Sequence, residues 1–205
     1  GTREPIDSVR YIGNSSSGLM GLALYKAAKS RGADVRLIAA NLEVGLTEGQ
    51  VNVTTTQELR GALSDLMPSA DVLIMAAAVS DYRVENPSSS KLKKADLGST
   101  PTLNLVENPD LLAELARSRS SSSRQILIGF AAETLSGDDL VASARKKLSA
   151  KNVDLIVAND VSGGAVFGSA VTSIKLVSVD DESSFEGSKL EAANTILDWI
   201  VTARK

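Results

Sequence analysis

Three short, almost uninterrupted apolar runs constrain the fold of this chain more than any other feature. They lie at residues 71–78, 125–131 and 154–158, and segments with helical periodicity separate them. Such a run is typical of a strand buried on both faces, as in a parallel sheet covered by helices on both sides. The alternation therefore predicts an α/β fold, Rossmann-like with three layers and a mostly parallel sheet. Ligands of such a sheet bind outside the carboxyl ends of its strands.

The remaining elements follow from the same periodicities. Helices are predicted at 19–31, 56–67, 110–117, 138–150 and 190–203, and further strands at 34–40 and 102–106. Residues 171–179 and the segment around Phe185 predict a C-terminal hairpin. The polar segment 79–100 is predicted to be one long loop, which in a compact domain is usually functional, and the serine run 118–123 a solvated linker.

Residues 1–205 are expected to form a single domain. The first loop of a sheet of this kind should follow a strand, and none precedes it here. Either that strand lies upstream, in a longer protein of which this chain is a fragment, or the sheet lacks an inner strand. We favour the first interpretation.

Composition excludes several classes of function. The chain has no Cys and no His, so cysteine nucleophiles and disulfides are excluded, and the commonest general base and metal ligand is missing. A metal would be a hard cation on oxygen ligands, with Mg²⁺ favoured if phosphates bind. The net charge of -3 gives no basic field for nucleic acid. No apolar run reaches membrane-spanning length and no secretory signal is visible, so we expect a cytoplasmic protein.

The stretch from Gly13 to Gly21 is rich in small and hydroxylic residues and leads into the apolar segment 19–28. The three serines at 15–17 are predicted to cap the first helix, since a hydroxyl can accept from the N–H groups of its first turn. Gly18 leaves room for a close approach to the backbone. Such a helix N-terminus can bind an anion, although an ordinary capped helix has the same pattern.

A second candidate segment lies at 76–83, at the predicted carboxyl end of a strand. Ala76, Ala77 and Ala78 would let a flat base or a ribose lie against the backbone. Asp81 could accept a hydrogen bond from a sugar or bind Mg²⁺. The alternative is a buried strand in which Asp81 only caps the following loop.

Three more segments carry chemistry of the same kind. Residues 91–94 hold three lysines that suit a triphosphate, although a solvated charge run is the commoner meaning of such a cluster. Residues 107–111 form a turn and a helix start, which plain capping would also explain. Phe130 follows a buried strand within 129–134, where it could stack on a base or belong to the core.

In order along the chain, these motifs resemble the phosphopantothenoylcysteine synthetases of coenzyme A biosynthesis, of the bacterial type often fused behind a flavin-dependent decarboxylase. The resemblance covers nearly the whole chain and rests on GTREPID at 1–7, VRYI at 9–12, NSSSGLMG at 14–21, AAVSDYR at 77–83, KLKK at 91–94, NPD at 108–110, GFAAET at 129–134, KNVDLI at 151–156 and ND at 159–160. Several motifs in the same order are more specific than any one of them.

The resemblance implies a ligase that joins 4′-phosphopantothenate to cysteine. The carboxylate of phosphopantothenate attacks the α-phosphate of CTP, giving an acyl-cytidylate and pyrophosphate, and the amine of cysteine then releases CMP. Mg²⁺ and a homodimer are implied as well. Asn14 would hold the acyl-cytidylate, and Lys91 would reach the phosphates from a mobile loop. The other residues expected to bind CTP are Ala76, Ala77, Ala78, Asp81, Asn108, Pro109, Asp110, Leu111, Phe130, Lys147 and Lys151.

Phosphopantothenate would contact Arg10, Asn14, Ser16 and Gly18, with Arg10 near the dimer interface, and Asp81 is the expected metal ligand. Two departures weaken the match: the family often has Lys where this chain has Leu19, and residues 170–173 do not form the Asn-rich turn that commonly follows Phe167-Gly168. A nicotinamide-dependent oxidoreductase and a non-catalytic nucleotide-binding module are the rival interpretations. The first lacks a GxGxxG motif, and the second would lack Asn14, Asp81 or Lys91.

Overall fold

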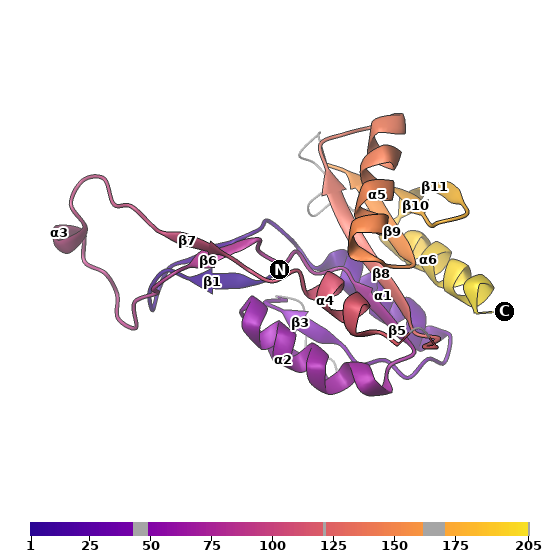
Figure 1. Cartoon of the computed structure of the whole chain (residues 1–205), viewed down its shortest axis with the longest axis horizontal. Coiled ribbons are helices and arrows are strands. Elements are labelled where there is room, and N and C mark those ends of the chain that lie inside the picture. The colour runs from indigo at the N-terminus through magenta and orange to yellow at the C-terminus, as the bar shows by residue number, and fades with distance from the viewer. Residues whose placement is uncertain (43–48, 121, 162–170, 205) are drawn as a thin grey trace.

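Figure 1 shows the computed structural model of the chain, which describes residues 1–42, 49–120, 122–161 and 171–204. Its body is built on a five-stranded sheet of order β11-β10-β9-β8-β5. These strands are β5 (Val72–Met75), β8 (Ile126–Glu133), β9 (Leu155–Asp160), β10 (Val171–Val177) and β11 (Glu182–Ser188). The first three run parallel, and β10 and β11 form an antiparallel hairpin beside them. The fold is therefore α/β with a central, mostly parallel sheet.

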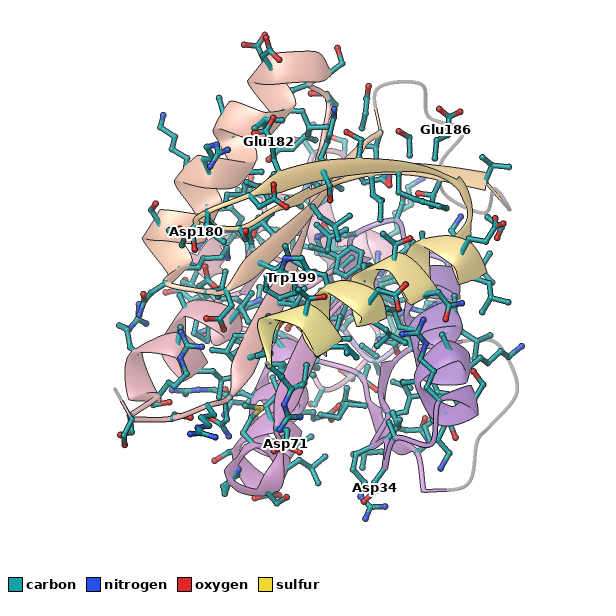
Figure 2. The ribbon with its side chains drawn as sticks, turned by 90° about the vertical axis from the view of Figure 1, so that its right-hand side faces the viewer. Asp34, Asp71, Asp180, Glu182, Glu186 and Trp199 are labelled. Atoms are coloured by element: carbon teal, nitrogen blue, oxygen red, sulfur yellow. The ribbon has the colours of Figure 1, made fainter. Side chains whose placement is uncertain are left out.

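Helices cover both faces of this sheet because alternate strand residues point to opposite sides. Ile128 and Val157 pack with α1 (Leu19–Ser30) and α6 (Lys189–Ala203). Leu127 and Ile156 pack with α4 (Leu111–Ser118) and α5 (Gly137–Lys151). All four side chains are at most 1% exposed, and burial of each stabilises the fold by about 1.5–3 kcal/mol. Figure 2 is viewed from the end opposite the arm described below. It shows α6, which carries Trp199, beside the β10–β11 hairpin.

A second, smaller piece of sheet lies beside β5. It consists of β3 (Ile38–Ala40) and β4 (Val51–Val53), which pair in parallel, and it is covered by α2 (Thr56–Leu66), whose end continues into the 3-10 turn η1 (Met67–Ser69). Leu73 and Met75 of β5 pack against the same apolar cluster. Among the described residues β5 pairs only with β8, and its four side chains are half-buried where the first four residues of β8 are buried. β5 is thus an edge strand with apolar side chains.

The first two residues connect the two pieces of sheet at their carboxyl ends. The amino group of Gly1 donates to the carbonyl of Ala40, 2.9 Å away, and the amide of Thr2 donates to the carbonyl of Ala78, 3.1 Å away. A Cβ on Gly1 would lie 2.7 Å from that Ala78 oxygen, so the close approach requires glycine. The chain therefore enters the molecule between β3 and β5.

A long arm projects from the body (Figure 1). It contains two antiparallel pairs, β1 (Arg3–Pro5) with β2 (Tyr11–Gly13), and β6 (Tyr82–Val84) with β7 (Leu105–Glu107). The short helix α3 (Lys94–Leu97) lies at its far end. The amide of Ser88 donates to the carbonyl of Ile6, 3.0 Å away, and so fixes the segment after β6 on the β1–β2 turn.

The layered α/β class, the five predicted helices and the buried strands predicted at 125–131 and 154–158 are confirmed. The strand predicted at 71–78 as buried on both faces forms only over Val72–Met75 and is half-buried, because among the described residues it lies at the edge of the sheet. The prediction of one loop over 79–100 is wrong, because β6 and α3 form within it, and the strands β1 and β2 were not predicted. These strands are three residues long, too short for a periodic pattern. Only Ile38–Ala40 of the strand predicted at 34–40 pairs. Residues 167–170 lie outside the described residues, while residues 171–173 of the departure from the Asn-rich turn belong to the start of β10. None of the helices in the described ranges has the length and apolar character needed to cross a bilayer.

The exposed edge of β5 has a measurable consequence. We expect the amides of Val72–Met75 that point away from β8 to exchange with deuterium faster than the amides of β8 and β9, because no neighbouring strand protects them. Amide exchange followed by NMR measures this difference directly. Equal protection across β5, β8 and β9 would contradict it.

Candidate functional site

The first helix begins differently from the prediction. Its N-cap is Gly18, in the left-handed conformation with φ 71°, and no side chain caps it. The nearest hydroxyl, Ser17 Oγ, lies 3.5 Å from the amide of Leu19, at the limit of a hydrogen bond. The predicted serine capping is therefore wrong. Among the described residues, this long contact is the only side-chain hydrogen bond to the first turn of the twelve-residue helix, so its other N–H groups can meet an anion.

Asn14 joins this loop to the end of β5. Its Nδ2 donates to the carbonyl of Val79 over 3.1 Å. A cavity of about 260 Å³ opens beside it, lined by Gly1, Thr2, Arg3, Tyr11, Gly13, Asn14, Ser15, Ser16 and Asn41. Ala76 and Phe130 pack against the core on the α1 side of the sheet, and Phe130 is half-buried. The structure thus brings Asn14, Ser16 and the strand end 76–78 into one region.

Two lysines lie on one face of α5, as their spacing predicts. Lys147 is paired with Glu133, 2.6 Å away, and Lys151 is paired with Asp110. The hydrogen bond from Lys147 holds the pKa of Glu133 below its ordinary value in spite of partial burial. Burial alone would raise the pKa of Asp110, but the hydrogen bonds from Lys151 and from the amide of Ala113 outweigh it and the pKa is lowered. Both carboxylates are therefore ionised at neutral pH, and an incoming phosphate would share the lysines with them.

Asn108 is turned into the protein and is only 8% exposed. Its Nδ2 donates to Thr56 Oγ1 over 3.3 Å and to the carbonyl of Ser80 over 2.9 Å. Its Oδ1 accepts from Arg83, 3.2 Å away. With its amide group engaged on both sides, the Asn108 side chain fixes the turn 107–111, while Asp110 caps α4 by accepting from the amide of Ala113. Pro109 and Leu111 belong to the same turn and helix start.

The hydrogen bonds of Asn108 continue through Thr56 to the buried carboxylate of Glu4. Glu4 is 3% exposed, and its Oε1 accepts from both the amide and the hydroxyl of Thr56, at 2.9 and 2.7 Å. Thr2 Oγ1 accepts from the amide of Ser80 over 2.9 Å. The network of Thr2, Glu4, Thr56, Ser80 and Asn108 therefore joins the arm, α2, the end of β5 and the β7–α4 turn.

The structure does not bring Arg10 and Lys91 to the other predicted residues of the same chain. Both lie on the arm, where Arg10 is bound to Asp7 and to the carbonyl of Leu92. Lys91 is exposed, and Figure 1 shows the neighbouring α3 far from α5. Asp81 lies at the base of the arm, exposed, and its carboxylate has no partner among the described residues.

Comparison with known proteins decides the family. The model of the DNA/pantothenate metabolism flavoprotein C-terminal domain matches residues 1–203. The chain belongs to this family. It is 44% identical to the coenzyme A biosynthesis bifunctional protein CoaBC of Mycobacterium bovis, over 98% of this chain and 50% of that protein, and 38% identical to CoaBC of Haemophilus influenzae, over 98% of this chain and 49% of that protein. The chain thus spans about half the length of these relatives.

Solved structures agree with this family assignment. The C-terminal domain of a CoaBC protein superposes with a TM-score of 0.76 and 31% identity, covering 97% of this chain and 89% of that one. The DNA/pantothenate metabolism flavoprotein from Streptococcus pneumoniae superposes with a TM-score of 0.82 and 26% identity, covering 98% and 95%.

The sequence alone did not reveal the residues whose contacts hold the site in place. The partners of Glu4 and Glu133, and the Leu92 amide that binds Asp7, come from other segments of the chain, so no local pattern predicts these contacts. The cap of α2, in contrast, does have a local sequence pattern. Thr55 and Glu58 form a capping box, and the spacing Thr-x-x-Glu is its sequence signature.

The buried network predicts a local cost for losing one hydroxyl. We expect Thr56→Val to lower the free energy of unfolding by about 1–3 kcal/mol, because Asn108 loses an acceptor and Glu4 a donor. Urea unfolding measures the change. Thr202→Val, which removes an exposed hydroxyl from α6, is the matched control and should cost less than about 0.5 kcal/mol. Equal losses in the two variants would contradict the role of the network.

Proposed function

We propose that this chain is a phosphopantothenate–cysteine ligase domain that uses CTP, and that it acts in coenzyme A biosynthesis. The observation that carries the proposal is the family match over residues 1–203 together with the motif residues at one edge of the sheet. The name of the CoaBC relatives supports the pathway, and their length supports a further domain fused upstream, for which we propose the decarboxylase.

The chemistry fits the groups at this edge. A carboxylate is a poor electrophile, so the acyl group must first be joined to a good leaving group. The phosphopantothenate carboxylate attacks the α-phosphorus of CTP, the bond to pyrophosphate breaks, and the acyl-cytidylate forms. The cysteine amine then attacks the acyl carbon, CMP leaves, and the amine loses a proton. CMP needs little help from an acid as it leaves, so a site without His can carry out both steps.

Two anions must meet in the first step, and this requires positive groups. Lys147 and Lys151 lie on α5 at the sheet edge. The N–H groups at the N-terminus of α1 supply a second region of positive charge. Asn14 lies between α1 and the β5 end, so it is placed to hold the acyl-cytidylate. We assign nucleotide binding to the segments 76–78 and 108–111.

Mg²⁺ fits the site only as a partner of the phosphates. No group of three or more potential metal-ligating side chains occurs in the described part of the chain. The Asp81 carboxylate is exposed and has no partner among the described residues, and Mg²⁺ commonly binds through one or two carboxylates plus substrate phosphates and water. When bound, the ion would neutralise phosphate charge. Asp81 would hold it at the base of the arm.

CTP binding tests the proposal. We expect isothermal titration in the presence of Mg²⁺ to show tighter binding of CTP than of ATP, and no binding of NADPH. Lys151→Gln should weaken CTP binding by about tenfold, because it removes one charge-assisted contact. Lys146→Gln is the matched control, since Lys146 is an exposed lysine of the same helix. Equal or tighter ATP binding, or equal losses in the two variants, would contradict the proposal.

We also propose a homodimer formed through the arm. Val9, Tyr11, Tyr82 and Leu105 are 61%, 52%, 53% and 47% exposed there, and the Arg3 guanidinium lies 4.7 Å from the centre of the Tyr11 ring. Exposed aromatic and Arg side chains of this kind are typical of interfaces. A partner's arm would bring Arg10 and Lys91 to a site that lacks both in one chain.

Mixing two inactive variants tests this arrangement. We expect Asn14→Ala and Lys91→Gln each to abolish most ligase activity. After the two proteins are mixed and exchange subunits, activity should return to about a quarter of the parent value, because half of the dimers are mixed and one of their two sites is intact. The readout is CMP release. A mixture that stays inactive although mixed dimers form would show that both residues act within one chain.

The edge of β5 suggests how the domain is completed. We propose that an extended segment ahead of Gly1 lies between β3 and β5, since Gly1 and Thr2 already bond to both neighbours at that point. Such a strand would join the two pieces of sheet into one.

A further inference from the structure

We propose that Asp7 is a positioning residue for the ligase reaction, holding Arg10 and the backbone beside Lys91 in one fixed arrangement at the arm. This inference rests on the proposed function, which assigns Arg10 and Lys91 to the substrates. Asp7 itself touches no other predicted site residue, so its role would be exerted through these two.

The Asp7 carboxylate is completely enclosed. Its side chain is 0% exposed, although it lies in the turn of a projecting hairpin. Oδ1 accepts from the amides of Val9 and Arg10, both at 2.8 Å. Oδ2 accepts from the Arg10 guanidinium, with Nε at 2.9 Å, and from the amide of Leu92 at 3.1 Å. A buried carboxylate is tolerated only when it is paired and hydrogen-bonded, as here.

The contact with Leu92 joins segments that are 85 residues apart in the sequence. Arg10 completes it, since its NH2 group donates to the carbonyl of Leu92 over 2.9 Å. The peptide groups on both sides of Leu92 are thus held by the Asp7–Arg10 pair. Together with the bond from Ser88 to Ile6, this fixes the segment 88–92 at two points on the β1–β2 turn.

Lys91 lies inside this fixed segment. Its ammonium group is exposed and has no partner among the described residues, so the backbone beside it sets where the charge can reach. The expectation of a loop that moves as a whole to bring Lys91 to the phosphates therefore does not suit residues 88–92. Asp7 instead determines the distance between the Arg10 and Lys91 charges, and a misplacement of about 1 Å can cost on the order of a hundredfold in rate.

A double-mutant cycle tests the positioning role. Asp7→Asn keeps the size of the side chain and removes its charge. In the parent we expect it to lower kcat/KM on the order of ten- to a hundredfold. In a Lys91→Gln background the same change should cost less than about threefold, because the charge that Asp7 positions is already absent.

Asp154→Asn is the matched control. Asp154 Oδ2 also accepts from an arginine, Arg119, and from a distant amide, that of Leu127 at 2.7 Å, but in the body of the protein. Its cost should be the same factor with and without Lys91. If Asp7→Asn costs the same factor in both backgrounds as well, the positioning role is overturned.

Hydrogen exchange tests, independently of activity, whether Asp7 holds the segment 88–92 on the β1–β2 turn. Amides of residues 88–97 should exchange faster in Asp7→Asn and at the parent rate in Asp154→Asn, while protected amides of β8 show that Asp7→Asn is folded. Unchanged exchange at 88–97 would overturn the proposal that Asp7 holds this segment in place. If the parent does not join phosphopantothenate to cysteine, the proposed function fails, and this exchange result still decides whether Asp7 holds the segment.

Discussion

The carboxyl group of Glu4 is buried at the junction between the arm and the body, and its oxygen atoms have to be met by donors inside the protein. Thr56 supplies two of them, and the Thr56 hydroxyl also accepts from Asn108. Because a buried carboxylate without partners would cost several kcal/mol, the donors cannot move away independently. The position of the β7–α4 turn is therefore tied to that of the arm. The geometry of the segment 108–111, which we propose binds the nucleotide, depends on this one buried group.

The positive groups of the site are already paired with carboxylates when no ligand is bound. Lys147 and Lys151 are paired with Glu133 and Asp110, and each carboxylate has a lowered pKa. A depressed carboxylate pKa contributes stability that is present above the unfolded pKa and is lost as pH falls through the folded value. The ligand-free site is thus stable near neutral pH. In the proposed function a triphosphate would bind by sharing these two lysines with their carboxylates.

The sequence was sufficient for the body of the fold and for part of the site. Residues 125–131 predicted a buried strand because apolar side chains on both faces leave no other environment for them, and Leu127 and Ile128 are fully buried. Lys147 and Lys151 could be placed on one face by helical spacing alone. The arm could not be predicted, because three-residue strands carry no period, and β6 pairs with β7 across a long connecting segment. The contacts of Asp7 with Leu92 and of Asn108 with Thr56 and Ser80 also join distant segments, so the sequence did not show them.

The separation of the arm from the body divides the residues that were predicted to share one site. The motif residues divide physically into two sets: those fixed by the parallel sheet and its helices, and those fixed by Asp7 and the β1–β2 turn. In the proposed function the first set binds the nucleotide. The second set is held at the arm by the Asp7 contacts, which would have to break for it to fold back onto its own body. The proposed dimer would avoid that cost, since two rigid parts can meet across an interface without either one being rearranged. The apolar surface of the arm and the distance of Lys91 from α5 then have one common explanation.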